Sequence, residues 1–347
     1  MIWGKAGFTS RSIRAFDLRS PVPFFLTLSH FSLSFSLSQQ SYHQFCKAAP
    51  PDFPLFMQPW YLDATCAGGV WDAVTVQKGE KTVAVWPYFL KKKGPWQYVA
   101  MPQLTRQMGP YLLPAYRNLR HETGLLEKLI AQLPPLAALE QDFNYTITNW
   151  LPFYWQGFRQ TTRYSYLLFI KDIELVRKNI MLDYRNQKIP KAARKVQVST
   201  DGSLQEFQRV HDRSYARQGL SAPISTAFLQ QVDEALAVHG QRELFFARDR
   251  QTGDIHSVAY LVWDAQSAYY LLAGDDPQYR ASGAGILLAW ETIRYAHKVL
   301  ELDTFDFAGS MVRPIERVRR QFGAVQQPYF RLQREWSPLW KLGKMLR

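Results

Sequence analysis

The chain has 347 residues, 47% of them hydrophobic and 20% charged, which is ordinary for a soluble globular protein and excludes extensive disorder. Its formal net charge of +13 favours polyanionic partners such as coenzyme A, RNA or acidic lipid surfaces. The two cysteines, Cys46 and Cys66, form neither a disulfide framework nor a metal-ligand motif, so we expect a cytoplasmic protein without a metal.

Residues 1 to about 38 differ in composition from the rest of the chain. Basic residues are followed by an apolar run from Val22 to Phe35, an order that is typical of a signal peptide. His30 and several serines interrupt the run, however, and no small-residue cleavage site follows it. We therefore predict that residues 1–40 are an extension, disordered or the product of a mis-assigned start, and dispensable; a targeting segment is the alternative.

The first half of the globular part alternates strand and helix patterns. We expect a short helix near 60–64, a hairpin of strands 71–76 and 82–90, a strand at 96–101, a helix at 121–133, a strand at 145–149, an aromatic turn or helix at 150–157 and a strand at 164–170.

The second half begins with helical patterns and ends with alternating strands and helices. We expect a helix at 173–187 broken at Pro190, a strand at 196–200, helices at 203–217 and 225–238, strands at 244–247, 255–263 and 267–274, a helix at 286–297, a strand at 304–307, a helix at 313–322 and a strand at 327–332. Ser203 and Glu206 have the spacing of a capping box.

The loop after strand 267–274 carries the strongest functional signal. It reads Arg280-Ala281-Ser282-Gly283-Ala284-Gly285 and opens a helix, so small residues would let a phosphate approach unpaired N–H groups and the positive end of the helix dipole. The spacing matches neither the P-loop nor the dinucleotide fingerprint. A small-residue helix start can also be a packing device, and this alternative stays open.

This loop resembles the acyl-coenzyme A pyrophosphate loop of the GNAT acyltransferase superfamily. Three further segments resemble the Fem-like branch, the relatives of methicillin-resistance factors: Phe305-Asp306-Phe307-x-Gly309-Ser310, Ile315-Glu316-Arg317, and Phe322-Gly323-Ala324 with Tyr329-Phe330. The resemblance extends upstream to Arg185-x-x-Lys188-Ile189-x-Lys191-Ala192 and, more loosely, to Tyr42. It implies an acyltransferase whose acyl-CoA is held by Arg280, Ser282, Gly283, Ala284 and Gly285.

The order of elements in the first half repeats that of the second. Pro114-Ala115-Tyr116-Arg117 precedes the first-half helix as Pro277-Gln278-Tyr279-Arg280 precedes the second, and Gly157 and Gly323 follow at similar spacings. We therefore predict an α/β (mixed α+β) fold made by tandem duplication of the GNAT fold, in which mixed, largely antiparallel sheets are flanked by helices.

We place the first copy at 41–170 and the second at 171–335, with a basic aromatic tail at 336–347. The first copy lacks clustered small residues at the matching loop, and Glu122 would repel a phosphate there, so its cofactor site is expected to be degenerate. The tail mixes Trp with Lys and Arg, so it could make a weak membrane-surface contact, although we expect it to pack on the second copy.

Transfer of an acyl group to an amine requires a proton acceptor and stabilisation of an oxyanion, but no covalent nucleophile. Candidate catalytic carboxylates are Asp275, Asp306 and Glu316, each of which could instead be a cap or an ion-pair partner. Many GNAT enzymes have a Tyr general acid four residues before the turn at Gly323, and this chain has Arg319 there.

The resemblance leaves the acyl donor open, because the Fem-like branch includes users of aminoacyl-tRNA as well as of acyl-CoA. The small-residue loop, and the lack of a long helical-hairpin insertion, favour N-acyl (probable N-acetyl) transfer from acetyl-CoA. The alternatives are aminoacyl transfer from tRNA to a cell-wall precursor, and a non-catalytic binding protein. Basic residues between Arg177 and Lys195 would suit coenzyme A phosphates or an RNA backbone, or simply a solvated helix face, and no DNA partner is expected. The acceptor is expected to be a small-molecule or cell-wall-precursor amine.

Overall fold

The computed structural model describes residues 36–216, 219 and 222–345. The first copy contains α1 (Leu37–Lys47), the 3-10 helix η1 (Leu55–Met57), α2 (Pro59–Thr65), β1 (Val70–Lys78), β2 (Lys81–Lys93), β3 (Trp96–Ala100), β4 (Tyr111–Leu112), the 3-10 helix η2 (Pro114–Tyr116), α3 (Leu119–Ala131), β5 (Ala138–Asp142), α4 (Leu151–Trp155) and β6 (Arg159–Phe169). The predicted extension lies mostly outside the described residues, but its last residues belong to α1, which Ser36 caps.

The second copy is richer in helices. It contains α5 (Ile173–Asn179), the π-helix η3 (Tyr184–Lys188), α6 (Ile189–Lys195), β7 (Val196–Ser199), α7 (Leu204–Ala216), α8 (Thr226–Val238), β8 (Arg242–Asp249), β9 (Ile255–Trp263), β10 (Ser267–Asp275), the 3-10 helix η4 (Pro277–Ser282), α9 (Ala284–Lys298), β11 (Thr304–Asp306), α10 (Arg313–Gln321) and β12 (Val325–Glu335), followed by α11 (Pro338–Met345).

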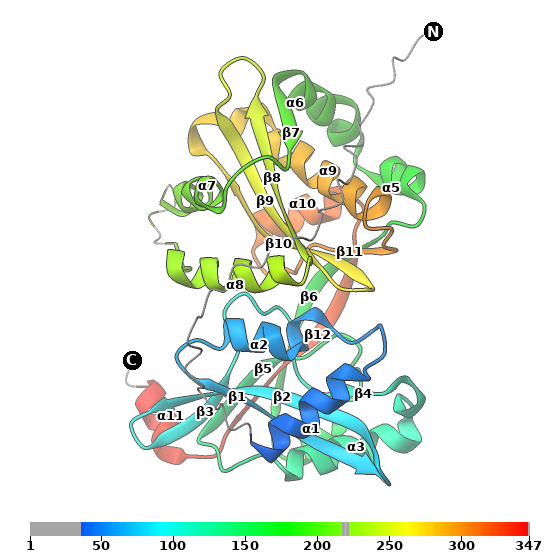
Figure 1. Ribbon diagram of the computed structural model, residues 1–347, viewed down its shortest axis with the longest axis vertical. Helices are drawn as coiled ribbons and strands as arrows, with labels where there is room; N and C mark the ends of the chain where they lie inside the picture. Colours follow the sequence, from blue (N-terminus) through cyan, green and yellow to red (C-terminus); the bar gives the residue numbers. More distant parts are fainter. Residues whose placement is uncertain (1–35, 217–218, 220–221, 346–347) are drawn as a thin grey trace, which may run out of the picture. The chain divides into compact units, whose positions relative to one another are not determined.

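All strands join one mixed sheet, in which helices flank the strands of both copies (Figure 1). Its order is β1-β2-β3-β5-β12-β6-β11-β10-β9-β8-β7, with β4 paired to β2. Among these strands, the parallel pairs β3–β5 and β10–β11 occupy corresponding places in the two copies. The tetrapeptides that suggested a repeat form the 3-10 helices η2 and η4, each just before a long helix. The predicted tandem GNAT fold is therefore confirmed.

The last strands of the two copies are exchanged. The first copy's β6 pairs with β11 of the second copy, whereas the second copy's β12 inserts between β5 and β6. The long β6 and β12 cross from one copy to the other in Figure 1. The first copy also sends η1 and α2 into the second copy's core, where Tyr61 is fully buried beside residues of α8. The copies therefore share their structure, although they are separate along the chain.

Three local predictions were wrong. The helix expected at 173–187 is interrupted at Ile180 and Met181, between α5 and η3. The alternating sequence at 145–149 is a turn and loop, and the strand lies earlier, at β5. Pro190 does not break the helix, because it occupies the first turn of α6, where its missing N–H is not needed. The capping box is confirmed, since Ser203 N–H donates to the Glu206 carboxylate at 2.9 Å and Glu206 N–H to Ser203 Oγ at 3.2 Å.

The tail packs on the first copy, so our expectation that it would pack on the second copy was wrong. The Trp340 ring of α11 lies 4.8 Å from the Tyr98 ring of β3 and 6.1 Å from the Trp96 ring. Across the described residues, no helix is both long enough and apolar enough to span a membrane.

Candidate active site

The site is built where β10 and β11 separate. The two strands pair in parallel over only three positions, from Ser267 opposite Thr304 to Tyr269 opposite Asp306. β10 then continues to Asp275, and its register against β9 shifts at Leu271, a β-bulge. After Asp306 the chain stays on β6, because Phe307 N–H donates to Tyr166 O at 3.0 Å. The strands therefore splay beyond Asp306 and leave ladder positions open.

Asp306 lies at the point of this splay and is 2% exposed. Its Oδ1 accepts hydrogen bonds from Ser165 Oγ of the exchanged β6 and from Ala308 N–H, the latter at 2.7 Å. Burial raises the pKa of Asp306 to about 6, and the hydrogen bonds and nearby arginines oppose that rise. A carboxylate in this state is ionised near neutral pH, yet basic enough to accept a proton from an amine.

Two arginines approach Asp306 from different copies. Arg319 of α10 lies over the Phe307 ring, with its Cζ 4.7 Å from the ring centroid, and over the Tyr270 ring at 5.4 Å. Arg106, in the first-copy loop between β3 and β4, donates from Nη2 to Leu271 O at 2.6 Å. The Nε of each arginine is buried without a hydrogen-bond partner among the described residues.

The charges of these arginines fit the developing charge of an acyl transfer. Burial lowers the pKa of Arg319 to about 10, so the guanidinium remains protonated at neutral pH. Two cations and one carboxylate at a buried splay leave a net positive charge, which can stabilise an oxyanion. Sequence reasoning had found Asp306 and noted Arg319, but it missed Arg106 and Ser165. Neither belongs to a motif, and their nearness to Asp306 arises only from the fold.

The other two candidate carboxylates lie elsewhere. Asp275, at the end of β10, has its carboxylate against Gly285, so that a β-carbon at Gly285 would collide with it. Glu316 lies on α10, where it accepts a hydrogen bond from Arg320 Nε at 2.9 Å, one helical turn along. Of the three candidates, Asp306 is the one that shares the splay with the two arginines.

The predicted cofactor loop faces a basic pocket. Gly283 is left-handed, with φ of 75°, and joins η4 to α9. Ser282 Oγ accepts a hydrogen bond from Ala284 N–H at 3.2 Å, whereas Arg280 and Ala281 are exposed. The pocket is lined by Gln278, Tyr279, Ala281 and Ser282 from the loop and by Lys191, Arg194 and Lys195 from α6. The loop and α6 together could therefore hold phosphates.

Helix α6 also restricts this loop. A β-carbon at Gly283 would lie 3.8 Å from Ala192 Cβ and from Lys188 O, so α6 packs directly on the start of α9. A second basic pocket lies near the other end of the same helical segment, lined by Tyr184, Lys188, Arg313, Pro314, Arg317, Val318 and Gln321. The segment from η3 to α6 thus carries a cationic pocket near each end.

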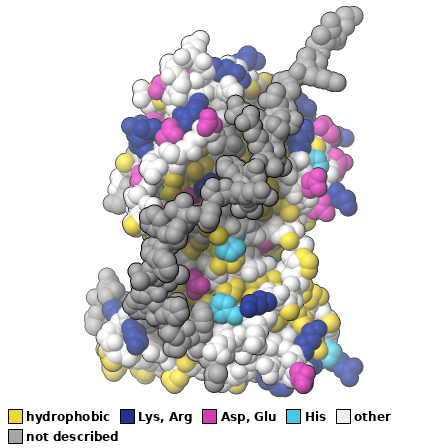
Figure 2. Space-filling model, viewed as in Figure 1, with side chains coloured by type: hydrophobic (Ala, Val, Ile, Leu, Met, Phe, Trp, Pro, Cys, Tyr) yellow, Lys and Arg dark blue, Asp and Glu magenta, His cyan; other side chains and the backbone are white. Residues whose placement is uncertain are grey.

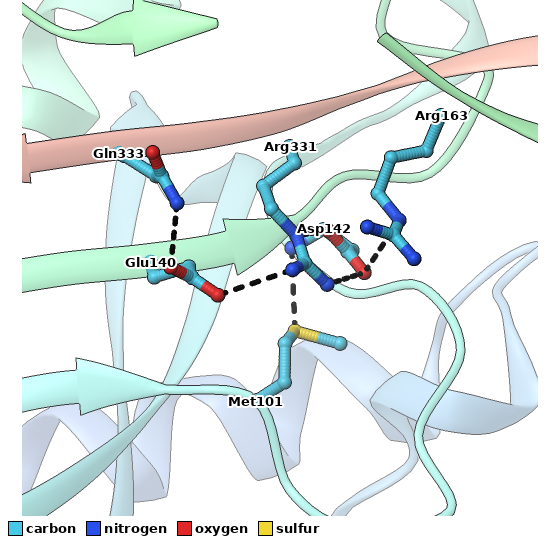
Figure 3. Close-up of polar contacts among 6 residues, drawn as sticks. All are labelled: Met101, Glu140, Asp142, Arg163, Arg331 and Gln333. Atoms are coloured by element: carbon cyan, nitrogen blue, oxygen red, sulfur yellow. Dashed lines mark hydrogen bonds and ion pairs between the residues drawn. The ribbon is translucent and has the colours of Figure 1, made fainter. Parts of the chain in front are cut away.

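At the matching end of β5 in the first copy, ion pairs join β5 to its other neighbour in the sheet, β12 (Figure 3). Arg331 of β12 donates from Nε and Nη2 to the two oxygens of Asp142, at 2.5 and 2.7 Å, and its Nη1 lies 3.2 Å from Glu140. Gln333 donates to Glu140 at 2.6 Å, and Arg163 Nε lies 3.9 Å from Asp142. Direct ion pairs therefore neutralise Asp142, whereas Asp306 interacts with its two arginines only at longer range. These ion pairs therefore hold the second copy's β12 against the first copy's β5.

Comparisons with known proteins agree with this architecture. Residues 181–322 match the family model described as an acetyltransferase (GNAT) domain. The fold is similar to the crystal structure of FemX, at 14% identity and a TM-score of 0.65, covering 85% of this chain and 96% of that one.

Two further structures have a similar fold. One is a tandem GNAT protein from the clavulanic acid biosynthesis pathway, at 12% identity and a TM-score of 0.53, covering 87% of this chain and 94% of that one. The other is the C-terminal domain of a putative lysylphosphatidylglycerol synthetase from Agrobacterium fabrum. It has 13% identity and a TM-score of 0.52, and the match covers 85% of this chain and 92% of that one. No curated protein sequence matches the chain. Within the part of the chain that the structure describes, no group of three or more His, Cys, Asp and Glu residues could hold a metal ion.

Proposed function

We propose that the chain is an acyltransferase of the GNAT superfamily, in the Fem-like form with two tandem copies, and that it moves an acyl group from acyl-coenzyme A to an amine at the splay between β10 and β11; the match of residues 181–322 to a GNAT domain and the similar folds of FemX and of a tandem GNAT protein support this. The observation that carries this proposal is Asp306, a buried carboxylate of raised pKa that lies near two arginines without a direct ion pair. A solvated acid would be too weak a base for this role near neutral pH.

In the proposed reaction the acceptor amine attacks the acyl carbonyl carbon while Asp306 takes the proton that the nitrogen loses. Arg319 stabilises the negative charge that develops on the carbonyl oxygen, and the carbon–sulfur bond then breaks, so that coenzyme A departs as the thiolate and the proton stays on Asp306. Acyl-coenzyme A supplies a reactive thioester. Its phosphates would be held by the loop 280–285 together with Lys191, Arg194 and Lys195, which line the adjacent basic pocket. The acceptor is a small-molecule or cell-wall-precursor amine.

A second candidate is aminoacyl transfer from aminoacyl-tRNA to such a precursor. Two observations favour it: α6 packs against Gly283, and the cationic pockets near both ends of the η3–α6 segment suit a polyanion longer than a pyrophosphate. On the described part of the face drawn in Figure 2, however, Lys and Arg side chains are interspersed with Asp and Glu over the second copy, without a continuous basic belt.

The donor is tested by binding and by transfer. Gly285→Glu is a poor probe, because its side chain would collide with Asp275 whether or not a ligand binds. Ala281→Glu is better, because the residue is exposed and lines the basic pocket. We expect it to weaken acetyl-CoA binding about tenfold or more in calorimetry, as a lost charge-assisted contact would. Gly124→Glu in α3 is the matched control, because a β-carbon there meets nothing within 4 Å.

Transfer assays with acetyl-CoA and with aminoacyl-tRNA separate the two candidates. Arg317→Glu, in the second pocket, should reduce transfer from aminoacyl-tRNA and leave acetyl-CoA binding unchanged. Transfer from aminoacyl-tRNA alone would replace the first candidate with the second. An absence of transfer from both donors, or equal loss of binding in the Ala281 and Gly124 variants, would overturn the proposed site.

A further inference from the structure

The first copy extends the side chain of Arg106 into the splay of the second copy. Arg106 comes from the loop between β3 and β4, and Tyr61 steadies this loop by donating from its hydroxyl to Leu104 O at 2.9 Å. The carbonyl that accepts from Arg106 belongs to Leu271, the residue at which β10 bulges out of register with β9. A bulge leaves its extra residue unpaired in the ladder, so Arg106 satisfies an acceptor that the sheet does not use.

We infer that Arg106 is a positioning residue of the second copy's reaction centre, so that the active site is a composite of both copies. This inference rests on the proposed acyl transfer. The bond to Leu271 fixes the guanidinium beside the splay, and it occupies only Nη2 of an arginine whose Nε has no hydrogen-bond partner among the described residues. The remaining donors can therefore act on Asp306 and on the acyl group beside it.

The groups around Asp306 and Arg106 explain why the arginine matters. Asp306 is attracted by Arg106 and Arg319 and lies within electrostatic range of Tyr145 and Tyr269. Arg106 itself interacts with Asp306 and with a tyrosine from each of α2, β12 and α7: Tyr61, Tyr329 and Tyr215. Because the tyrosines are neutral near pH 7, the two arginines are the charges that keep the buried carboxylate ionised.

The test compares Arg106→Gln with Arg117→Gln. Arg117 is a matched control, because it also lies in the first copy and donates to a backbone carbonyl, that of Leu112 at 2.8 Å, but it pairs with Asp52 far from the splay. We expect Arg106→Gln to lower kcat/KM on the order of 10-fold to 100-fold. In the pH profile of kcat/KM, the rise on the acid side should move to higher pH in this variant, because removing a cation raises the pKa of Asp306. Arg106→Lys should restore the position of this rise and only part of the rate.

A purely structural role predicts something different. In that case Arg106→Gln and Arg117→Gln would both lower the melting temperature, and neither would move the pH profile; that result would overturn the inference. If Arg106→Gln fails to fold, an Arg106→Lys variant with no loss of kcat/KM would do the same.

A second measurement requires no turnover. The melting temperature is followed against pH in the wild type, Arg106→Gln, Asp306→Asn and the double variant. Coupling predicts that the effect of Arg106→Gln on the pH dependence disappears when residue 306 is Asn, and additive effects at every pH would contradict it. This coupling can be present in a protein that transfers no acyl group, so failure of the proposed function and failure of this inference are distinguishable.

Discussion

Asp306→Asn should separate the activity of this protein from its stability. The amide keeps an oxygen that can accept from Ser165 Oγ and Ala308 N–H, so the local structure should survive. The variant cannot accept a proton from the amine. We expect kcat/KM to fall by about 10² to 10⁴, the usual contribution of a general base. In the wild type the rate should rise through about pH 6 and level off above it, because Asp306 must be ionised to act.

The stability effect has the opposite sign. The folded-state pKa of Asp306 is raised from its ordinary value of 3.8 to about 6, so the folded protein disfavours the ionised carboxylate. Wild-type stability should therefore fall as the pH rises from about 4 to about 6 and stay low above that. The shift corresponds to at most about 3 kcal/mol at pH 7. Asp306→Asn removes this penalty, so the variant should melt at a higher temperature than the wild type at pH 7 and lose the advantage near pH 4.

Thermal denaturation across this pH range, together with initial rates on the same preparations, tests both halves of the argument. Asp201→Asn is a suitable control, because this residue is exposed and precedes α7. The reasoning would be refuted by an Asp306→Asn variant of wild-type activity, or by a stability difference that shrinks as the pH rises.

Three further predictions concern the rest of the fold. Arg331→Met should lower the free energy of unfolding by roughly 3 kcal/mol in urea titrations, because it removes two short hydrogen bonds from the buried Asp142 and leaves it only the more distant Arg163; an unchanged midpoint would contradict this. Burial raises the pKa of Cys46 to about 12 and that of Cys66 further, so thiol reagents at pH 8 should label neither until the protein is denatured, and rapid labelling of the native protein would be evidence against the buried positions. Deletion of residues 1–35 should leave the melting temperature unchanged in calorimetry, because α1 begins at Leu37 with its own cap, and a protein that no longer folds would show that the segment is required.

Most of the elements could be predicted from the sequence, because their buried faces follow simple periods. Strand β5 could not, since its Glu140, Gln141 and Asp142 read as polar loop. They tolerate burial only because distant partners satisfy them: Trp86 Nε1 donates to Gln141 at 2.6 Å, and Arg331 pairs with Asp142. The segment 145–149 shows the reverse case. Its residues alternate as in a strand, but no neighbouring strand pairs with them, so the segment forms a turn and a loop.

The candidate site was predictable only in part, for a similar reason. Asp306 lies in a recognisable motif at the end of a strand, so local sequence indicated it. Arg106 is a lone arginine in a loop rich in Gly, Pro and Tyr, and its function depends on a contact with Leu271, 165 positions later in the chain. No local pattern encodes such a pairing. The exchange of β6 and β12 cannot be predicted from local sequence either. Both segments have the alternating pattern of a strand, and this pattern does not indicate which neighbouring strands they pair with.

The place of β12 in the sheet has a consequence for how the chain reaches its fold. This strand follows every other strand of the sheet along the chain, yet it fills a gap between β5 and β6 in the middle of the sheet. Until it arrives, the half-sheet β1–β5 and the half-sheet β6–β11 each present an unpaired inner edge, of the kind that templates intermolecular strand pairing. Pairing of β12 with β5 and β6 is slow, because these strands are far apart along the chain. A nascent or truncated chain that lacks residues 325–335 should therefore stay in an aggregation-prone state that depends on chaperones, with neither copy complete.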